Sequence, residues 1–128
     1  VRSLAKKSQE GSGVSIKDVD IFHPYDGYAT FHQNFLEGFQ WHGVKEGEAH
    51  DFYAGDIRVE GPHPLNSAGG NLGNGRIRSI LWRDAIEQLR GTAGARQVKI
   101  KNGQPDMALA GCNTPDSCGF LTMSRHQP

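Results

Sequence analysis

The stretch from Asn66 to Gly91 constrains the fold of this 128-residue chain more than any other, because a glycine-rich loop runs into an amphipathic helical pattern. Four of its first ten residues, NSAGGNLGNG, are glycine. Glycine reaches backbone angles closed to other residues and lets a ligand or another segment come close. The unpaired N–H groups at a helix start favour anions, and Arg76 and Arg78 add positive charge. The GxxGxG spacing is neither a dinucleotide fingerprint nor a P-loop, so a close-packed turn without a ligand is the alternative.

Charge and hydropathy exclude several classes of protein. Lys and Arg together number 14, and so do Asp and Glu, so no net charge attracts nucleic acid or an anionic membrane. No apolar run approaches the roughly 20 residues that span a bilayer, and the first residues lack the apolar core of a signal peptide. We therefore expect residues 1–128 to form one soluble, cytoplasmic domain with a modest core and no nucleic-acid partner.

Cysteine and histidine patterns do not predict a metal site. Cys112 and Cys118 flank the turn-like NTPDS, where a hairpin could bring them together, but two free thiols are expected in a reducing compartment. The six histidines are scattered, and none forms a helical i, i+4 pair with a neighbouring carboxylate that would indicate zinc.

Near the N-terminus, a helix over residues 2–9 should end at the Gly11-Ser12-Gly13 stop. The next apolar run, Val19 to Phe22, predicts a strand that ends before Pro24. Such a strand delivers His23, Tyr25 and Asp26 to its C-terminal edge, which is where ligands collect in open α/β sheets.

Two amphipathic helices are expected. Asp26 can cap the first, whose buried face comprises Tyr28, Phe31, Phe35, Leu36 and Phe39. In the second, the buried stripe comprises Leu81, Trp82, Ala85, Ile86 and Leu89, with Arg83, Asp84, Glu87 and Arg90 facing water and Gly91 as the C-cap. Residues 44–61 read as a long connection with one short strand, and residues 107–111 and 119–123 as a final antiparallel hairpin.

The order of these parts resembles the C-terminal half of the thiolase superfamily, most closely the thiolase-like lipid-transfer proteins, also described as sterol carrier or acetyl-CoA acetyltransferase-like. The resemblance runs from about Val14 to Met123, and LNSAGGNLGNGR with IEQLRGTAGARQV is its most specific part. It implies an α/β fold, with a mixed sheet of about four to five strands covered by helices and ending in an antiparallel hairpin.

Residue by residue, the resemblance implies an altered active site. The position of the thiolase general-base histidine holds Arg76, and arginine stays protonated at neutral pH. The oxyanion-binding asparagine is replaced by Tyr25, and a Tyr-Asp step is typical of the branch whose steroid-degrading members are retro-aldol lyases acting on acyl-CoA thioesters. Those lyases carry a second tyrosine at the position of Arg76. The second thiolase cysteine falls near Gly111, which makes the adjacent Cys112 a displaced candidate or a small core residue.

The implied function is binding of acyl-CoA thioesters and support of acyl transfer or retro-aldol chemistry, only together with a partner. Tyr25 and Asp26 would be the acid/base pair and Arg76 an anion or thioester contact, while the expected ligand-binding residues are His23, Asn66, Gly69, Gly70 and Asn71. Coenzyme A thioester would be the substrate, with no tightly bound cofactor or metal. The N-terminal thiolase half with its nucleophilic cysteine is expected on a separate chain, unless this chain self-associates. The alternative is a non-catalytic lipid- or acyl-binding or assembly module, which could form a homo-oligomer.

Overall fold

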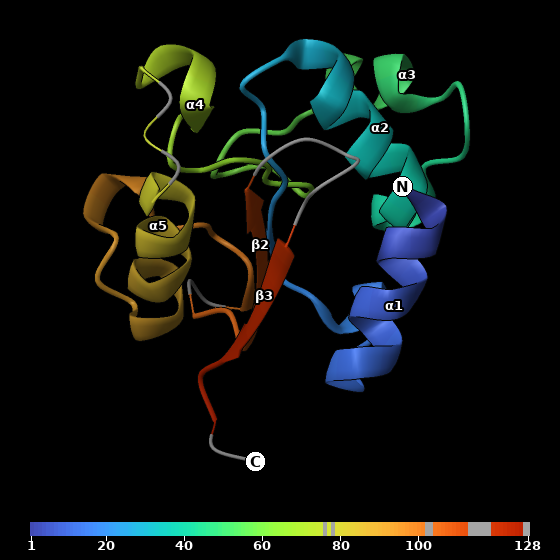
Figure 1. Ribbon diagram of the computed structural model, residues 1–128. Coiled ribbons are helices and arrows are strands. Elements are labelled where there is room, and N and C mark those ends of the chain that lie inside the picture. The colour runs from blue at the N-terminus through green and yellow to red at the C-terminus, as the bar shows by residue number, and fades with distance from the viewer. Residues whose placement is uncertain (76, 78, 102–103, 113–118, 127–128) are drawn as a thin grey trace.

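A mixed three-stranded sheet forms the centre of the molecule in the computed structural model, which describes residues 1–75, 77, 79–101, 104–112 and 119–126 (Figure 1). The strands are β1 (Ile21–His23), β2 (Met107–Cys112) and β3 (Gly119–Ser124), in the order β1-β2-β3. β1 pairs with β2 in parallel and β2 with β3 in antiparallel register. The predicted hairpin is therefore confirmed, but the described residues form three strands and not the expected four to five.

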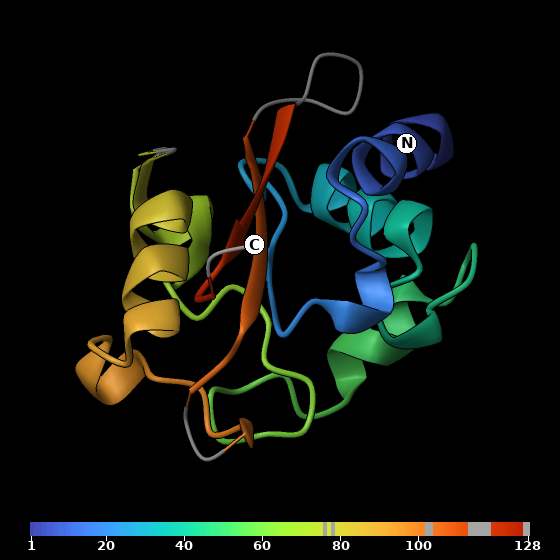
Figure 2. The same ribbon diagram turned by 90° about the horizontal axis from the view of Figure 1, so that it is seen from below.

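Helices cover both faces of this sheet (Figures 1 and 2). One face carries α1 (Arg2–Ser12), α2 (Ala29–Phe39) and α3 (Ala49–Ala54), and the other carries α4 (Gly70–Gly73) and α5 (Ser79–Arg90). Successive side chains of a strand point to opposite faces, so β1 contributes Phe22 to the core on the α2 side and Ile21 to the core on the α5 side. His23, two residues after Ile21, also points its side chain to the α5 side, where it is hydrogen-bonded to Asp84.

The core under α2 is aromatic. Phe22 packs against Phe39 and Trp41, with ring centroids 5.3 and 5.1 Å apart. Three of the residues predicted for the buried face of this helix are fully buried: Phe35, Leu36 and Phe39. The helix start differs from the prediction, because Tyr28 is the N-cap residue, without a side-chain cap bond, and is 47% exposed. Asp26 does not cap α2, because its carboxylate is hydrogen-bonded to Asn71 instead.

The α5 face is apolar along one stripe and polar along its border. Leu81, Ala85 and Leu89 are buried as predicted, and Gly91 ends the helix with a φ of 70°. Two predictions for this helix are wrong: Ile86 is 41% exposed, and Asp84 does not face water but is 1% exposed. The α5 turn that carries Asp84 lies over the end of β1, where the carboxylate meets His23.

Two connections also differ from their predicted form. The segment 44–61 contains the helix α3 and no strand. The glycine-rich loop does not run directly into α5: Gly69 and Gly70, with φ of 85° and 71°, lead into the single turn α4, and α5 begins later at Ser79. The N-terminal helix extends to Ser12 and is capped by Gly13. No helix within the described part of the chain is long and apolar enough to cross a membrane.

Candidate functional site

Polar side chains gather at the edge of the sheet where the parallel strands β1 and β2 both end. His23 pairs in register with Ala110, so the residues that follow each strand leave at the same edge. His23 is the last residue of β1, and Tyr25 and Asp26 follow it in the chain. In Figure 1 this edge lies between α4 and the start of α2. The C-terminal edge of parallel strands is the usual ligand side of an open α/β sheet.

Asp26 ties the β1 end to the glycine-rich loop. Its Oδ1 accepts hydrogen bonds from the backbone N–H of Asn71 at 2.6 Å and from Asn71 Nδ2 at 3.1 Å. A Cβ atom at Gly70 would overlap Asp26 Oδ2, and Gly70 also has a left-handed φ of 71°. Gly70 is therefore needed both for the backbone turn and for the approach of the carboxylate.

Tyr25 is enclosed by its own turn. Its side chain is 3% exposed and belongs to the core on the α2 side. A Cβ atom at Gly27 would overlap the Tyr25 hydroxyl, so the bare Cα of Gly27 makes the space that the phenol occupies. The phenol thus lies under the backbone at the same edge as Asp26.

Asp84 is the centre of a buried polar network on the α5 side. Its Oδ2 lies 2.9 Å from His23 Nε2 and accepts a hydrogen bond of 2.5 Å from the Ser67 hydroxyl and a weak one of 3.5 Å from Gln88 Nε2. Its Oδ1 pairs with the Arg96 guanidinium. These donors and the positive charge of Arg96 offset part of the cost of removing the carboxylate from water.

His23 is neutral at physiological pH. Burial lowers its pKa from 6.5 to about 4, against smaller raising effects of the Asn66 side chain, the Phe22 backbone and the Asp26 charge. A neutral imidazole has one N–H, and Asp84 can only accept, so Nε2 carries the proton and donates it to the carboxylate.

A second buried imidazole, that of His32, lies beside the Asn66 side chain. Nε2 of His32 lies 3.1 Å from the Asn66 amide, and its Nδ1 is hydrogen-bonded to the Tyr53 hydroxyl on α3. Burial also lowers the pKa of His32 to about 4, and burial raises the pKa of Tyr53 well above its usual value. Asn66 itself has a left-handed φ of 45°, which few residues other than glycine adopt.

The structure brings most of the sequence-predicted residues to one edge. Hydrogen bonds join Asp26 to Asn71, and Asn66 to Gly69 and to the carbonyl of Pro24, which lies between His23 and Tyr25 in sequence. Arg76, Arg78 and Cys118 lie outside the described residues. Sequence reasoning missed four partners: Asp84, Ser67, His32 and Tyr53. Asp84 and Gln88 are four residues apart beside the apolar stripe of one helix, a spacing that lets their side chains pair. This spacing was the sequence signal for a polar partner of Asp84, and the prediction that Asp84 faces water overlooked it.

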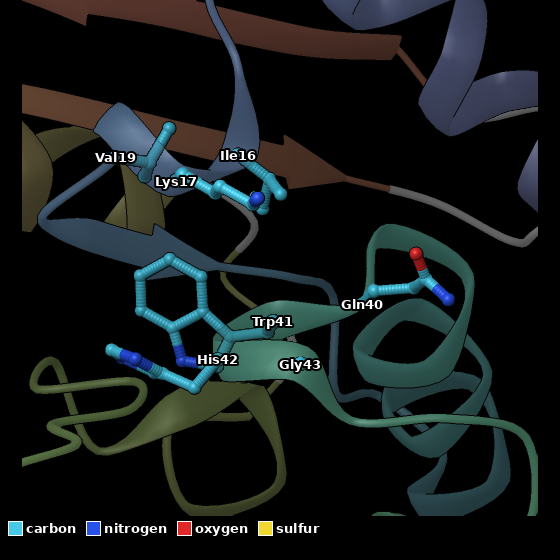
Figure 3. Close-up of a pocket in the computed structure, with 7 residues that line it drawn as sticks. All are labelled: Ile16, Lys17, Val19, Gln40, Trp41, His42 and Gly43. Carbon is cyan, nitrogen blue, oxygen red and sulfur yellow. The ribbon is translucent and has the colours of Figure 1, made fainter.

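A cavity of about 320 Å³ lies away from this edge, lined by Ile16, Lys17, Val19, Gln40, Trp41, His42 and Gly43 (Figure 3). Val19 precedes β1 while Tyr25 and Asp26 follow it, so the cavity is at the other end of the strand. Among the described residues, no three His, Cys, Asp or Glu side chains are grouped as metal ligands.

Comparison with known proteins gives a consistent result. The family model described as "Thiolase C-terminal domain-like" matches residues 1–112. A 17-hydroxy-3-oxo-4-pregnene-20-carboxyl-CoA lyase of Mycobacterium tuberculosis (strain ATCC 25618 / H37Rv) is 36% identical over 99 residues, which are 72% of this chain and 25% of the lyase.

Among solved structures, a chain of an "Ltp2-ChsH2(DUF35) aldolase" matches with a TM-score of 0.80 and 24% identity, over 99% of this chain and 32% of that chain. At this identity the match establishes the fold alone. The chain therefore spans between a quarter and a third of the length of these two relatives.

Proposed function

The chain belongs to the thiolase C-terminal domain-like family, and from this premise we propose that it supplies part of the active site of an acyl-CoA lyase of the retro-aldol type. The observation that carries the proposal is its 36% identity to a carboxyl-CoA lyase. The position of Tyr25 and Asp26 at the ligand edge of the sheet also supports the proposal.

A retro-aldol cleavage of a β-hydroxyacyl-CoA thioester needs a base and an acid. The β-hydroxyl loses its proton and becomes a carbonyl, the bond between Cα and Cβ breaks, and its electron pair moves into the thioester to form an enolate. A proton then adds to Cα. Hydrogen-bond donors near the thioester oxygen stabilise the charge that develops there, and this is usually a large part of the catalysis.

In this proposal Tyr25 and Asp26 are the acid and the base. The phenol of Tyr25 donates a hydrogen bond to the thioester oxygen or a proton to the enolate. Oδ1 of Asp26 accepts both hydrogen bonds from Asn71, so we assign proton transfer to Oδ2, which lies beside Gly70. Arg76, at the position of the family's histidine, is proposed as the contact to the thioester or another anionic group of coenzyme A.

The proposal includes a further polypeptide segment or a partner chain, since this chain corresponds to only 25% of the lyase's length. The missing segment would carry the thiolase nucleophile region and much of the coenzyme A site. Exposed apolar side chains border the proposed site and fit a covered surface: Leu72 is 65% exposed and Ile77 is 57% exposed.

The test is an assay of the assembled protein that contains this chain, with a β-hydroxyacyl-CoA as substrate and the ketone and acyl-CoA products measured by mass spectrometry. Tyr25→Phe should lower kcat by about 10²- to 10⁴-fold, the usual range for loss of an acid/base group. Tyr28→Phe is the matched control, because Tyr28 is exposed three residues away and has no assigned role. Equal kcat for wild type and Tyr25→Phe would remove Tyr25 from the mechanism.

A second function is favoured by the same exposed residues, namely a non-catalytic acyl-binding or assembly module. Leu72→Ser and Ile77→Ser should then weaken association with the partner or with a second copy of the chain, measured by light scattering, while acyl-CoA is bound but not cleaved. Product formation by the assembled protein would reject this alternative.

A further inference from the structure

One carboxyl oxygen on α5 holds two separate segments of the candidate site. Oδ2 of Asp84 accepts a hydrogen bond of 2.9 Å from His23 Nε2 and another of 2.5 Å from the Ser67 hydroxyl. His23 is the last residue of β1, and Ser67 lies at the start of the glycine-rich loop. Because Asp84 is buried, water does not compete for these hydrogen bonds. The end of β1 and the loop are therefore attached to α5 at the same atom.

Neighbouring side chains hold this arrangement in place. The Arg96 guanidinium pairs with the other oxygen of Asp84, Oδ1. Gln88 is buried and lies one helical turn after Asp84. Its Nε2 donates to the Ser67 hydroxyl at 3.1 Å and to the carbonyl of Arg96 at 2.6 Å. A rotation of the Asp84 carboxyl group would break several of these contacts at once, so its oxygen is a fixed point for both segments.

The glycine-rich loop carries the position of Ser67 to Asn71. The side chain of Asn74 braces the loop from inside, because its Nδ2 donates to the carbonyls of Ala68 and Gly70 at 3.2 and 2.7 Å. Without such hydrogen bonds, a segment rich in glycine would be flexible. The two ends of the braced segment, Ser67 and Asn71, should therefore move together.

Asn71 attaches the far end of this segment to Asp26. Its backbone N–H and its Nδ2 both donate to Asp26 Oδ1, at 2.6 and 3.1 Å. Asp26 lies only three residues after His23, so the contacts close into a ring. The ring runs through Asp84, His23, Asp26, Asn71 and Ser67. It fixes Asp26 from two directions, along the chain from His23 and across the loop from Ser67.

We propose that Asp84 is a positioning residue that holds Asp26 in place for the proton transfer assigned to its Oδ2. This inference rests on the proposed lyase reaction, in which Asp26 and Tyr25 exchange protons with the substrate. Asp84 acts through His23 on one side and through Ser67 on the other. A displacement of about 1 Å can lower the rate of an enzyme by about 10²-fold, so the ring should affect kcat more than substrate binding.

Amide hydrogen exchange in the assembled protein without substrate, read by mass spectrometry with fragmentation to single residues, tests the ring. Ser67→Ala removes the hydroxyl that joins the loop to Asp84. Exchange of the Asn71 N–H should become about 10-fold faster, as expected when one hydrogen bond is weakened. Exchange in α2, which covers the other face of the sheet (Figure 1), should stay unchanged. Unchanged exchange at Asn71, or faster exchange throughout the chain, overturns the inference.

Asp84→Asn tests the positioning residue itself. Arg96 can only donate, so the new amide turns its oxygen to Arg96 and its NH₂ group to His23 and Ser67. Both segments then lose their acceptor, and exchange at Asn71 should be at least as fast as in Ser67→Ala. Exchange as slow as in the wild type would contradict the proposal. If Asp84→Asn does not fold, Ser67→Ala decides, because it leaves the contacts of Asp84 with His23 and Arg96 in place.

The lyase assay separates positioning from a general structural role. In Ser67→Ala, kcat should fall by about 10- to 10²-fold while KM changes by less than about 2-fold, since Asp26 acts in the transition state. An unchanged kcat would overturn the catalytic role of the ring. Glu87→Gln is the matched control, because Glu87 also pairs with Arg96 from the same helix, and it should leave kcat and exchange unchanged. If the wild type does not cleave the substrate, the proposed function fails, whereas exchange at Asn71 still decides whether the ring exists.

Discussion

Acidification should destabilise this protein through two buried histidines, His23 and His32. The pKa of each is lowered from 6.5 to about 4, chiefly because burial disfavours the charged ring. Between these two values the unfolded chain binds more protons than the native chain, so the free energy of unfolding rises with pH and is lost as pH falls from 6.5 toward 4. The charges of Asp26 and Arg96 also act on His23, and the charge of Asp26 acts on His32, but burial has the largest effect on both rings.

The magnitude follows from the two shifts. Each lowering of about 2.5 pH units corresponds to about 3 kcal/mol, so the pair contributes roughly 6 kcal/mol to the difference between neutral pH and pH 4. Because a small domain has a total stability of about 5–15 kcal/mol, the protein should unfold largely through this window.

Urea unfolding at a series of pH values from 4.5 to 7.5, followed by circular dichroism, measures this effect. In the steep part of the window the wild type should lose about 2.7 kcal/mol per pH unit, corresponding to two protons. His32→Gln should halve this slope, and His50→Gln, which changes an exposed residue of α3, should leave it unchanged. A wild-type slope below about 1.4 kcal/mol per pH unit, less than one proton, would refute the assignment of two buried neutral rings.

Two further substitutions test packing at the site and in the core. Gly70→Ala should lower the free energy of unfolding by about 1–3 kcal/mol, because an alanine there is strained at a φ of 71° and its Cβ would displace Asp26. Gly73→Ala is the control, since a Cβ at Gly73 meets no atom within 4 Å, and an equal loss for both would contradict the argument. Phe35→Ala should lower the free energy of unfolding, measured by chemical denaturation, by about 3–5 kcal/mol, because this residue is 0% exposed. A loss below about 1 kcal/mol would contradict tight packing of the aromatic core around Phe35.

Local pattern predicted much of the fold. The helical periodicity of Phe35, Leu36 and Phe39 was enough to identify a buried face, and the turn between two apolar runs was enough to predict the β2–β3 hairpin. These features depend on residues close in sequence. The segment 44–61 was misread because Phe52 and Tyr53 are compatible with a strand or with one side of a short helix, and contact with α2 decides for the helix.

The polar network could not be predicted in the same way. Asp84 carries a charge, and charged residues on amphipathic helices usually face water, so its burial depends on His23, which is 61 positions away in sequence. Likewise His32 and Asn66 are 34 positions apart, and nothing in either local sequence indicates the contact. The strand pattern was enough to place Tyr25 and Asp26 at the ligand edge, whereas their acid/base role came only from the resemblance to a family motif, and the role of Arg76 stays a prediction.

The parallel pairing of β1 with β2 has a consequence for the order in which the protein folds. Residues 21–23 pair with residues 108–110, so these two strands are far apart in sequence, whereas β2 ends at Cys112 and β3 begins at Gly119. Closing so long a loop has a large entropic cost before any contact is gained, which slows folding. We therefore expect the hairpin to form early and the insertion of β1 beside it to complete the sheet, so Phe22 and Ile21 would stay exposed until residues 108–110 are in place.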